Sequence, residues 1–352
     1  MAGQTVHLHE KYAKKLDQAF TLESVVKGRL TREEEFVGAR TVRISNVDTV
    51  PLNDYDRAAT ANRYGTPTEV GDTVQELTMT QDKSFSAVID KGNSVDQCIN
   101  KAGRFMKIET EEAVIPAYDK YCLSRLCTLG GTIAGNSEAI SAANVIKRMS
   151  AARQTFVNGK VPLANRTWYV NTLVFNALVE TDQFKNLEKL GAKAVAKGQV
   201  GEIFGAPVVE VPDEYLPEGV NFLLVHKRAA CAPEKIGDNN LHIDPPGISG
   251  NLIEGRYYYD CFVYAHKAVG IYVDVTTGDG VEVLAAPTIA ADTGAITGDG
   301  TVWYTIDGTD PRYSATRKMG KAPEAEEGML VRAYQEAEGK FPSPVAEAVI
   351  TG

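Results

Sequence analysis

Two extended segments with a long polar stretch between them constrain the fold of this chain more than any other feature. Residues 41–47 alternate apolar and polar side chains, and so do residues 74–90, a pattern typical of half-buried strands. Residues 51–72 between them are polar and rich in turn formers. We therefore predict a protruding hairpin. An isolated two-stranded ribbon is only marginally stable in water, so we expect this hairpin to lie on a neighbour, such as another subunit.

Residues 1–35 are a second segment that cannot build a core. Apolar side chains between Tyr12 and Val26 fall near helical spacing, which predicts a moderately amphipathic helix. This helix is too short and too polar to form a core alone, so we expect the arm to pack on something else. The arm and the hairpin together suggest that much of residues 1–92 becomes stable only when other copies of the chain supply partners.

A long helix is predicted to follow the hairpin. Ser94 and Gln97 fit the S-x-x-Q capping box, and apolar residues then recur at steps of three or four. Pro116 lies inside this pattern and is expected to end or kink the helix. The pattern reaches toward residues 115–128, before a pair of glycines.

Residues 132–280 mix helices and strands without a regular βαβα repeat, so α+β is the better description of the fold class. Periodicity predicts two helices, and we expect Thr172 to cap the second of them. The predicted helices are 136–159 and 172–180, and the predicted strands lie in 166–171, 198–212, 221–232 and 257–275, the last with a break near His266 and Lys267.

Residues 283–352 predict a separate small β-sandwich, because short strands there are separated by Gly, Asp and Pro. In the strand that begins at residue 301, Val302 and Tyr304 are expected on one face and Trp303 on the other. This region carries six Lys and Arg against ten Asp and Glu. The surplus of acidic residues suits a solvated outer domain.

Composition excludes several classes of function. The net charge is −9, and no segment has the basic surplus that binding of duplex DNA needs. No apolar run approaches the roughly 20 residues that cross a bilayer, and the first residues lack a signal-peptide pattern, so we expect synthesis in a cytoplasm. The five cysteines are irregularly spaced, which favours reduced, buried thiols.

The motifs of nucleotide-binding loops, zinc proteases and serine hydrolases do not occur in the sequence. Each group of potential ligands or acids has a simpler structural interpretation. We interpret the first group as part of a flexible, solvated terminus, the second as a turn, the third as hydrogen-bonded structural histidines, and the last two as solvated faces. In that order the groups are His7, His9 and Glu10; His242 and Asp244; His226 and His266; Glu33, Glu34 and Glu35; and Glu109, Glu111 and Glu112. We predict no catalytic residue, no cofactor and no metal site.

Asp307 and Asp310 need separate treatment, because two carboxylates in one loop could bind calcium. A calcium site requires more ligands than this loop supplies. Asp307-Gly308 suits a turn with positive φ, and Asp310-Pro311 prolongs it. We therefore interpret the two aspartates as residues that shape a corner.

The same stretch resembles a known family. VWYTIDGTDPRYSA (302–315), with the later MLVRAY and SPVAEAVI, resembles the immunoglobulin-like domain of the chitobiase/β-hexosaminidase C-terminal type. That family reads Y-T-x-D-G-[ST]-x-P, then an apolar strand ending in Ala, then S-x-V. The matching residues here are Tyr304, Thr305, Asp307, Gly308, Thr309, Pro311, Val331, Ala333, Ser343 and Val345. The resemblance implies a fold and not a catalyst.

Residues 1–280 resemble the major capsid proteins of tailed phages, which have the Hong Kong 97 fold. The resemblance rests on the order of elements, with local echoes at 114–126, 198–217 and 257–275. It implies the following division: 1–35 N-terminal arm, 36–92 E-loop hairpin, 93–281 P-domain with spine helix and A-domain, and 282–352 immunoglobulin-like outer domain.

The resemblance implies a structural protein that is no enzyme. It would assemble with copies of itself, as hexamers and pentamers, into an icosahedral virion shell around double-stranded phage DNA. It further implies scaffold, portal and decoration proteins as partners, no sequence-specific DNA contact and no membrane. A glycan-binding surface protein, or a non-catalytic part of a carbohydrate-active enzyme, is the alternative. For surface glycan contact the candidates are Trp303, Arg312 and Tyr313.

Overall fold

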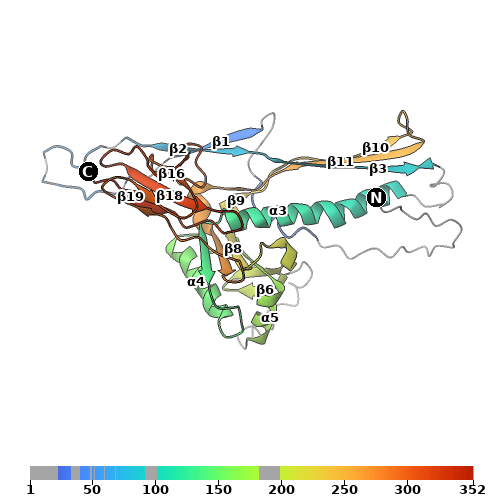
Figure 1. The fold of residues 1–352 in the computed structure, drawn as a ribbon, viewed down its shortest axis with the longest axis horizontal. Coiled ribbons are helices and arrows are strands. Elements are labelled where there is room, and N and C mark those ends of the chain that lie inside the picture. The colour runs from blue at the N-terminus through green and yellow to red at the C-terminus, as the bar shows by residue number, and fades with distance from the viewer. Residues whose placement is uncertain are drawn as a thin grey trace. The chain divides into compact units, whose positions relative to one another are not determined.

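The computed structural model describes residues 23–32, 40–47, 50, 52–58, 60–67, 69–91, 101–181 and 199–351 of the chain. The chain divides into two compact units. One comprises residues 1–37 and 79–283, and the other comprises residues 38–78 and 284–352. Figure 1 shows the fold with its elements labelled.

The predicted hairpin is divided between two sheets. Strand β1 (Thr41–Val47) pairs antiparallel with β2 (Asp72–Thr78), as expected. The expected single strand over 74–90 is wrong, because β3 (Gln81–Asp90) begins a new element and pairs with β11 (Gly250–Tyr259). At the break, the backbone N–H of Thr80 donates to the Asp260 carboxylate at 2.7 Å. This contact takes Thr80 out of the ladder.

Strands β10 (Glu234–Ile243), β11 and β3 form an antiparallel sheet in that order. Phe85 on β3 lies directly opposite Gly255 on β11. Its ring covers that glycine, since a Cβ at position 255 would lie 2.2 Å from Phe85 Cε1. The ring also meets Phe105 of the neighbouring helix edge to face, with centroids 6.0 Å apart. The glycine therefore makes room for the aromatic contact that joins sheet and helix.

The long helix is present and reaches residues 115–128 as predicted; of the two outcomes expected at Pro116, an end or a kink, the helix does not end there. It runs through α2 (Lys101–Glu109), a π-helical turn (Thr110–Val114) and α3 (Ile115–Thr128). In the π-turn the N–H of Ile115 bonds the carbonyl of Thr110, five residues earlier. Proline lacks an N–H, and its ring clashes with the carbonyl four residues before it. The wider turn directly before Pro116 relieves that clash. The predicted cap at Ser94 lies outside the described residues.

The described part of the arm has partners within the chain, contrary to the expectation that residues 1–92 lack them. Residues 23–32 form turns and not a helix, and Val26 and Leu30 are buried. The backbone N–H of Val25 donates to Asp119 of α3 at 2.8 Å. Thr31 forms a parallel bridge with Cys231. The preceding part of the arm lies outside the described residues.

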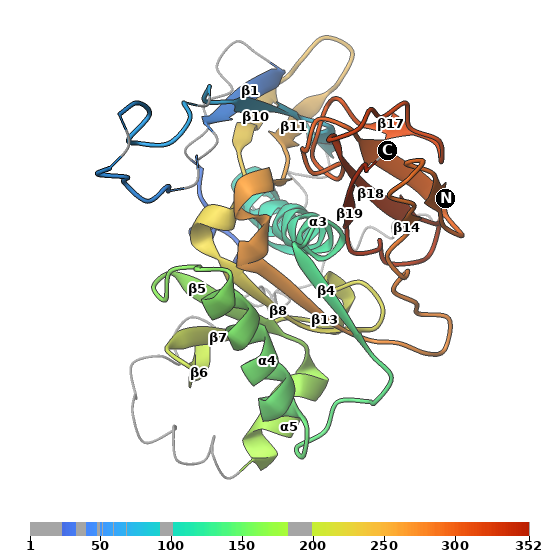
Figure 2. The ribbon, with the colours of Figure 1, turned by 90° about the vertical axis from the view of Figure 1, so that its left-hand side faces the viewer.

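A six-stranded mixed sheet forms the main core of the same unit, as Figure 2 shows. The order is β4 (Thr132–Asn136), β13 (Ile271–Thr276), β8 (Val220–His226), β5 (Arg166–Val170), β7 (Ala206–Glu210) and β6 (Gln199–Ile203). Helices α4 (Val145–Asn158) and α5 (Thr172–Glu180) pack on it through Phe156 and Leu178, against Trp168 and Phe222. The mixed α and β architecture agrees with the predicted class.

Two details of this region differ from the sequence expectations. The helix predicted over 136–159 begins only at Val145, because Thr132–Asn136 is strand β4. Asn171, and not Thr172, caps α5, since its Oδ1 accepts from the N–H of Val174 at 2.8 Å. The break expected near His266 is present as a 3₁₀ segment, Ala265–Gly270. The remaining short elements are Asp213–Tyr215, Lys227–Ala229, β9 (Ala230–Cys231) and β12 (Phe262–Val263).

Residues 284–352 contain a four-stranded and a two-stranded antiparallel sheet. The first has the order β17 (Lys318–Met319), β16 (Thr301–Thr305), β18 (Leu330–Glu336) and β19 (Ala346–Val349), and the second joins β14 (Thr288–Ile289) to β15 (Ile296–Thr297). Both contribute to one core, where Ile296 packs with Val302, Tyr304 and Val331. Val302 and Tyr304 thus share one face of β16, as predicted, and that face points into the core.

Candidate functional site

The loop after β16 is a corner, as the sequence indicated. Asp307 Oδ1 accepts from the N–H of Thr309 at 3.0 Å, and Oδ2 accepts from the Thr316 hydroxyl at 2.6 Å. Burial acts to raise the pKa of Asp307, but these hydrogen bonds outweigh it and lower the pKa. Asp310 accepts from Arg312, both from its backbone N–H at 3.0 Å and from Nη2 at 2.7 Å. Both carboxylates are thus held by protein donors.

The three glycan-contact candidates have different surroundings. Trp303 is half-buried on β16; its Nε1 donates to Glu336 at 2.6 Å, and the Arg317 guanidinium lies 4.4 Å from its ring centroid. Tyr313 is buried, and Arg312 stacks over it at 5.2 Å. Glycan contact by these residues stays a prediction, and the structure does not group them into one exposed patch.

The other candidate ligands are dispersed. His226 is buried at the end of β8, where its Nδ1 accepts from the N–H of Arg228, so the satisfied structural histidine is confirmed. His242 lies on strand β10 and not in a turn, with its Nε2 3.2 Å from Glu254. His7, His9 and Glu10, and Glu33 to Glu35, lie outside the described residues. Within the described ranges, no group of three or more His, Cys, Asp or Glu is placed to hold a metal ion.

The cysteines behave as predicted where they are described. Cys122, Cys127, Cys231 and Cys261 are free and buried, and burial raises the pKa of the Cys127 thiol. Cys98 lies outside the described residues. None of the helices in the described ranges is long and apolar enough to cross a membrane.

Three buried aspartates that the sequence did not single out organise the larger unit. Asp119 on α3 is 1% exposed and accepts from Ser24 Oγ at 2.7 Å, besides the N–H of Val25. Burial raises the pKa of Asp119, against these hydrogen bonds. Its carboxylate therefore ties the arm segment to the long helix.

Asp260 joins the start of β3 to the same helix. Its Oδ2 accepts from the N–H and the hydroxyl of Thr80, at 2.7 and 2.9 Å, and Oδ1 accepts from the Tyr121 hydroxyl at 2.7 Å. Burial raises the pKa of Tyr121 to about 12. The tyrosine remains a hydrogen-bond donor at neutral pH, which keeps this junction intact.

Asp274 lies on β13, next to the edge strand β4 of the six-stranded sheet, and is fully buried. Arg148 of α4 contacts both of its oxygens, at 3.1 and 2.5 Å, and Asn136 and Asn221 each donate to it at 2.9 Å. One carboxylate thus links β13 to β4, β8 and α4. The signal in the sequence was a single aspartate in the apolar run IYVDV, but the run alone does not reveal its partners.

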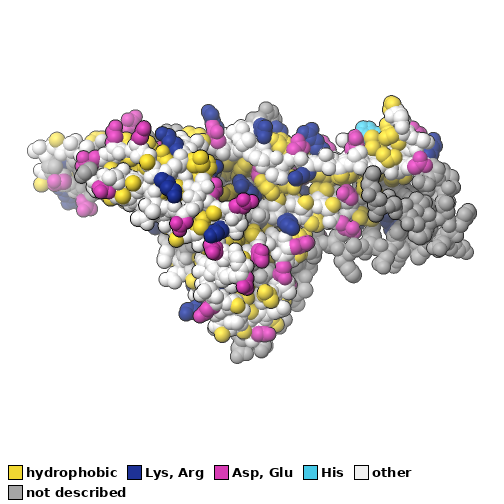
Figure 3. All heavy atoms as spheres, in the orientation of Figure 1, with side chains coloured by type: hydrophobic (Ala, Val, Ile, Leu, Met, Phe, Trp, Pro, Cys, Tyr) yellow, Lys and Arg dark blue, Asp and Glu magenta, His cyan; other side chains and the backbone are white. Residues whose placement is uncertain are grey.

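The candidate functional surface is the sheet β10–β11–β3. Nine of the ten residues of β10 are exposed, among them Leu241 and Ile243 at 41% and 75% exposure, and Val88 of β3 is 55% exposed. Figure 3 shows apolar side chains interspersed with charged ones along this part of the molecule. Ion pairs such as Arg256–Asp82, at 2.7 Å, lie beside them. A surface of this composition suits a contact with another protein.

No protein-family model matches the chain. No curated protein matches it in sequence. Its fold, however, is similar to that of several solved structures from bacteriophages.

A chain of Mycobacterium phage Che8 aligns with a TM-score of 0.61 and 20% identity, over 76% of this chain and 96% of that one. A chain from the capsid structure of the cyanophage P-SCSP1u aligns with a TM-score of 0.58 and 14% identity, over 77% of this chain and 93% of that one. A chain from the mature capsid of bacteriophage PhiM1 aligns with a TM-score of 0.56 and 14% identity, over 78% of this chain and 93% of that one. The fold is that of phage capsid chains. At these identities the likeness establishes the fold alone.

Proposed function

We propose that this protein is the structural major capsid protein of a tailed phage. The observation that carries the proposal is the extent of the fold likeness. It spans 93–96% of the phage chains and leaves 22–24% of this chain uncovered. A likeness over almost the whole of those chains involves the complete architecture and not a shared motif.

Two features of the described residues support assembly. Large apolar side chains are exposed on extended segments of the chain. They include Leu52 and Tyr64 between β1 and β2, and Ile243 on β10. Burying such side chains against other copies would contribute about 25 cal/mol for each Å² of apolar surface. The buried aspartates 119, 260 and 274 each hold elements together, which suits a rigid building block.

The finer assignment is of the Hong Kong 97 type, with 1–35 as arm, 36–92 as E-loop and 93–281 as P-domain with spine helix and A-domain. In this proposal the protein lies in the virion capsid, after synthesis in the host cytoplasm. Hexamers and pentamers of it would enclose double-stranded DNA without reading its sequence. Scaffold, portal and decoration proteins would be its other partners, and it would not be an enzyme.

For residues 282–352 we propose an immunoglobulin-like outer domain. The shared core of its two sheets and the corner at Asp307 support this assignment. Residues 284–352 are also about a fifth of the chain, close to the share that the phage chains leave uncovered. No observation on the described residues favours the glycan-binding alternative, which stays a prediction.

Expression of the full chain tests the proposal. We expect closed particles of uniform size in negative-stain images and a fast-sedimenting species in the ultracentrifuge. If only monomers or dimers form over a range of salt, pH and protein concentration, with and without co-expressed neighbouring phage genes, the capsid function is wrong. Circular dichroism of the same sample shows whether the chain is folded.

A further inference from the structure

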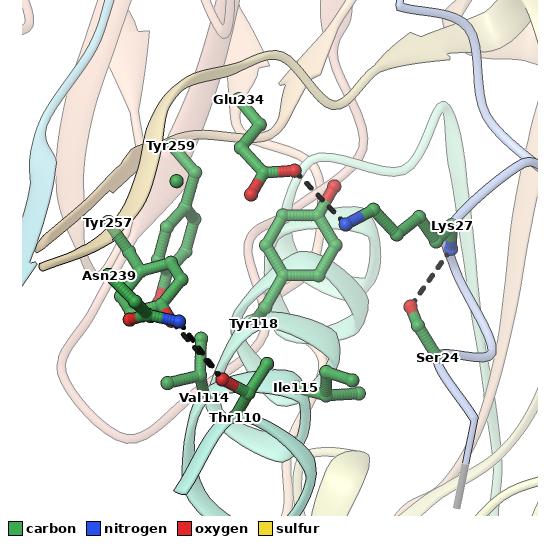
Figure 4. Close-up of a pocket in the computed structure, with 11 residues that line it drawn as sticks. Ser24, Lys27, Thr110, Val114, Ile115, Tyr118, Glu234, Asn239, Tyr257 and Tyr259 are labelled. Atoms are coloured by element: carbon green, nitrogen blue, oxygen red, sulfur yellow. Dashed lines mark hydrogen bonds and ion pairs between the residues drawn. The ribbon is translucent and has the colours of Figure 1, made fainter. Parts of the chain in front are cut away.

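A pocket of about 190 Å³ opens in the unit that contains residues 79–283, between the long helix and the sheet β10–β11–β3 (Figure 4). Two irregular stretches of backbone border it. The π-turn Thr110–Val114 lies on the helix side, and a β-bulge between Glu234 and Ile236 lies on the sheet side. Each irregularity widens its element locally, and both kinds recur beside functional sites in proteins.

The walls of this pocket are mostly aromatic and aliphatic. Tyr118, Tyr257 and Tyr259 line it and are at most 7% exposed, while Val114 and Ile115 contribute aliphatic surface. An apolar cavity of about 150 Å³ in another protein is large enough for benzene. The pocket therefore has room for one aromatic ring with a small substituent, and its walls favour such a ring.

One polar group in the wall has no partner. The Tyr257 hydroxyl donates to Asn239 Oδ1 at 2.7 Å, and the Thr110 hydroxyl donates to the carbonyl of Met106 at 2.7 Å. The Tyr259 hydroxyl, in contrast, forms no hydrogen bond with any described residue, although Tyr259 is only 4% exposed. The hydroxyl oxygen of Tyr259 is itself within reach of solvent, because among the described residues the buried side-chain polar atom without a partner is Nε of Arg125. A ligand that bonds this hydroxyl would replace solvent there and pair a group that the chain leaves unpaired.

The charges at the mouth balance one another. Lys27 lies 3.2 Å from Glu234, and Arg32 lies 3.6 Å from the same carboxylate. Figure 4 shows the Lys27–Glu234 pair beside the tyrosine rings. Gly237 leaves space for this arrangement, since a Cβ there would lie 2.6 Å from Glu234 Oε1. With its charges already paired, the entrance favours an uncharged ligand.

We propose that this pocket binds a single aromatic ring that carries a hydroxyl group, that is, a phenol. The ring would lie among Tyr118, Tyr257 and the aliphatic pair, and its hydroxyl would bond Tyr259. The ligand is either a free phenol or the end of a tyrosine side chain from a polypeptide. The inference does not depend on the capsid function.

Saturation-transfer NMR on the full chain tests this, because the method works for single molecules and for large particles. We expect p-cresol to bind at least roughly fivefold more tightly than toluene, since only p-cresol offers the hydrogen bond. In Tyr259→Phe, which keeps the ring, the two affinities should become about equal. Val114→Phe should fill the pocket and abolish binding of both, whereas Val157→Phe, at an exposed position on α4, should leave binding unchanged.

N-acetyl-tyrosinamide separates the two sources. Binding comparable to that of p-cresol supports a tyrosine side chain, and binding of p-cresol alone supports a free phenol. The proposal is overturned if p-cresol does not bind, if toluene binds equally well, or if Tyr259→Phe changes nothing. Particle formation is recorded on the same samples, so a failed capsid function is recognised separately from an empty pocket.

Discussion

The two large sheets of residues 79–283 differ in how much of their surface the chain itself covers. Every residue of β5 and β8 in the six-stranded sheet is buried. In the three-stranded sheet β10 is almost entirely exposed, and exposed residues alternate with half-buried ones along most of β3. The first sheet has helices on one face and the arm segment near the other, where the Tyr169 hydroxyl donates to the carbonyl of Val25 at 3.3 Å.

We expect the first sheet to contribute mainly to the stability of the fold and the second mainly to contacts with other copies of the chain. The six-stranded sheet carries a dense core and a buried ion pair, so changes there should act on folding. The three-stranded sheet leaves nearly all of β10 and many residues of β3 exposed, and changes at these exposed positions should act on contacts with other copies. Four variants test this division, and they are ordered by their expected effect on the free energy of unfolding.

Asp274→Asn should have the largest effect. It leaves the buried Arg148 without its counter-charge, which typically costs about 3–5 kcal/mol. Chemical denaturation of unassembled protein measures the loss. The matched control is Asp82→Asn, which breaks the Arg256 pair on the exposed sheet and should change stability little, because solvent screens it. Equal losses in the two variants would contradict the division.

Gly255→Ala should destabilise the chain by about 1–3 kcal/mol, because the new Cβ would overlap the Phe85 ring and force it to move. The same substitution should cost less in a Phe85→Ala background. Gly103→Ala in α2 is the control, since nothing lies within 4 Å of its added Cβ. There alanine should stabilise the helix by roughly 0.5–1 kcal/mol. A loss at both glycines would argue against the aromatic contact.

His226 should make the stability depend on pH. Burial, and then the positive charge of Arg166, lower the pKa of His226 in the folded chain. As the pH falls below about 6.5, the unfolded chain therefore binds the proton first, and stability decreases. Denaturation midpoints at pH 7.5 and 5.5 should differ less in His226→Asn than in the wild type. An unchanged slope in His226→Asn would refute the assignment.

Ile243→Asp should change the stability of the unassembled chain least, within roughly 0.5 kcal/mol, because the side chain is 75% exposed. Its effect should appear in assembly, where a charge replaces apolar contact surface and particle yield falls. Val349→Asp, at a 51% exposed position on β19, is the control that should still form particles. Normal particles from Ile243→Asp would exclude this sheet as an assembly contact.

Local patterns were sufficient for several elements. The helix Thr172–Glu180 and the strand Arg166–Val170 match the predicted ranges closely, because their apolar spacing and flanking turn residues agree. The corner at Asp307 was predictable for the same reason, since a side chain that bonds the backbone two residues later needs no distant partner. These features depend on neighbours in the sequence.

Other features depend on residues far apart in the chain. Residues 80–84 are all polar, but this run does not show where the strand breaks. The break coincides with the hydrogen bond from Thr80 to the carboxylate of Asp260, 180 residues away. The pocket between the long helix and the sheet β10–β11–β3 likewise forms only where the π-turn lies opposite the β-bulge. The periodicity of the sequence does not predict that arrangement. The buried Arg148–Asp274 pair joins residues 126 positions apart.

The sequence by itself determined the α+β class, the long helix, the separate β-rich region at the C-terminus and the reduced state of the four described cysteines. Each follows from composition or from periodicity over a few turns or strands. The tertiary structure alone decided which strands pair, where the arm segment docks and which aspartates are buried. The physical reason is that burial and long-range hydrogen bonds belong to pairs of residues, and a single sequence shows only one partner at a time.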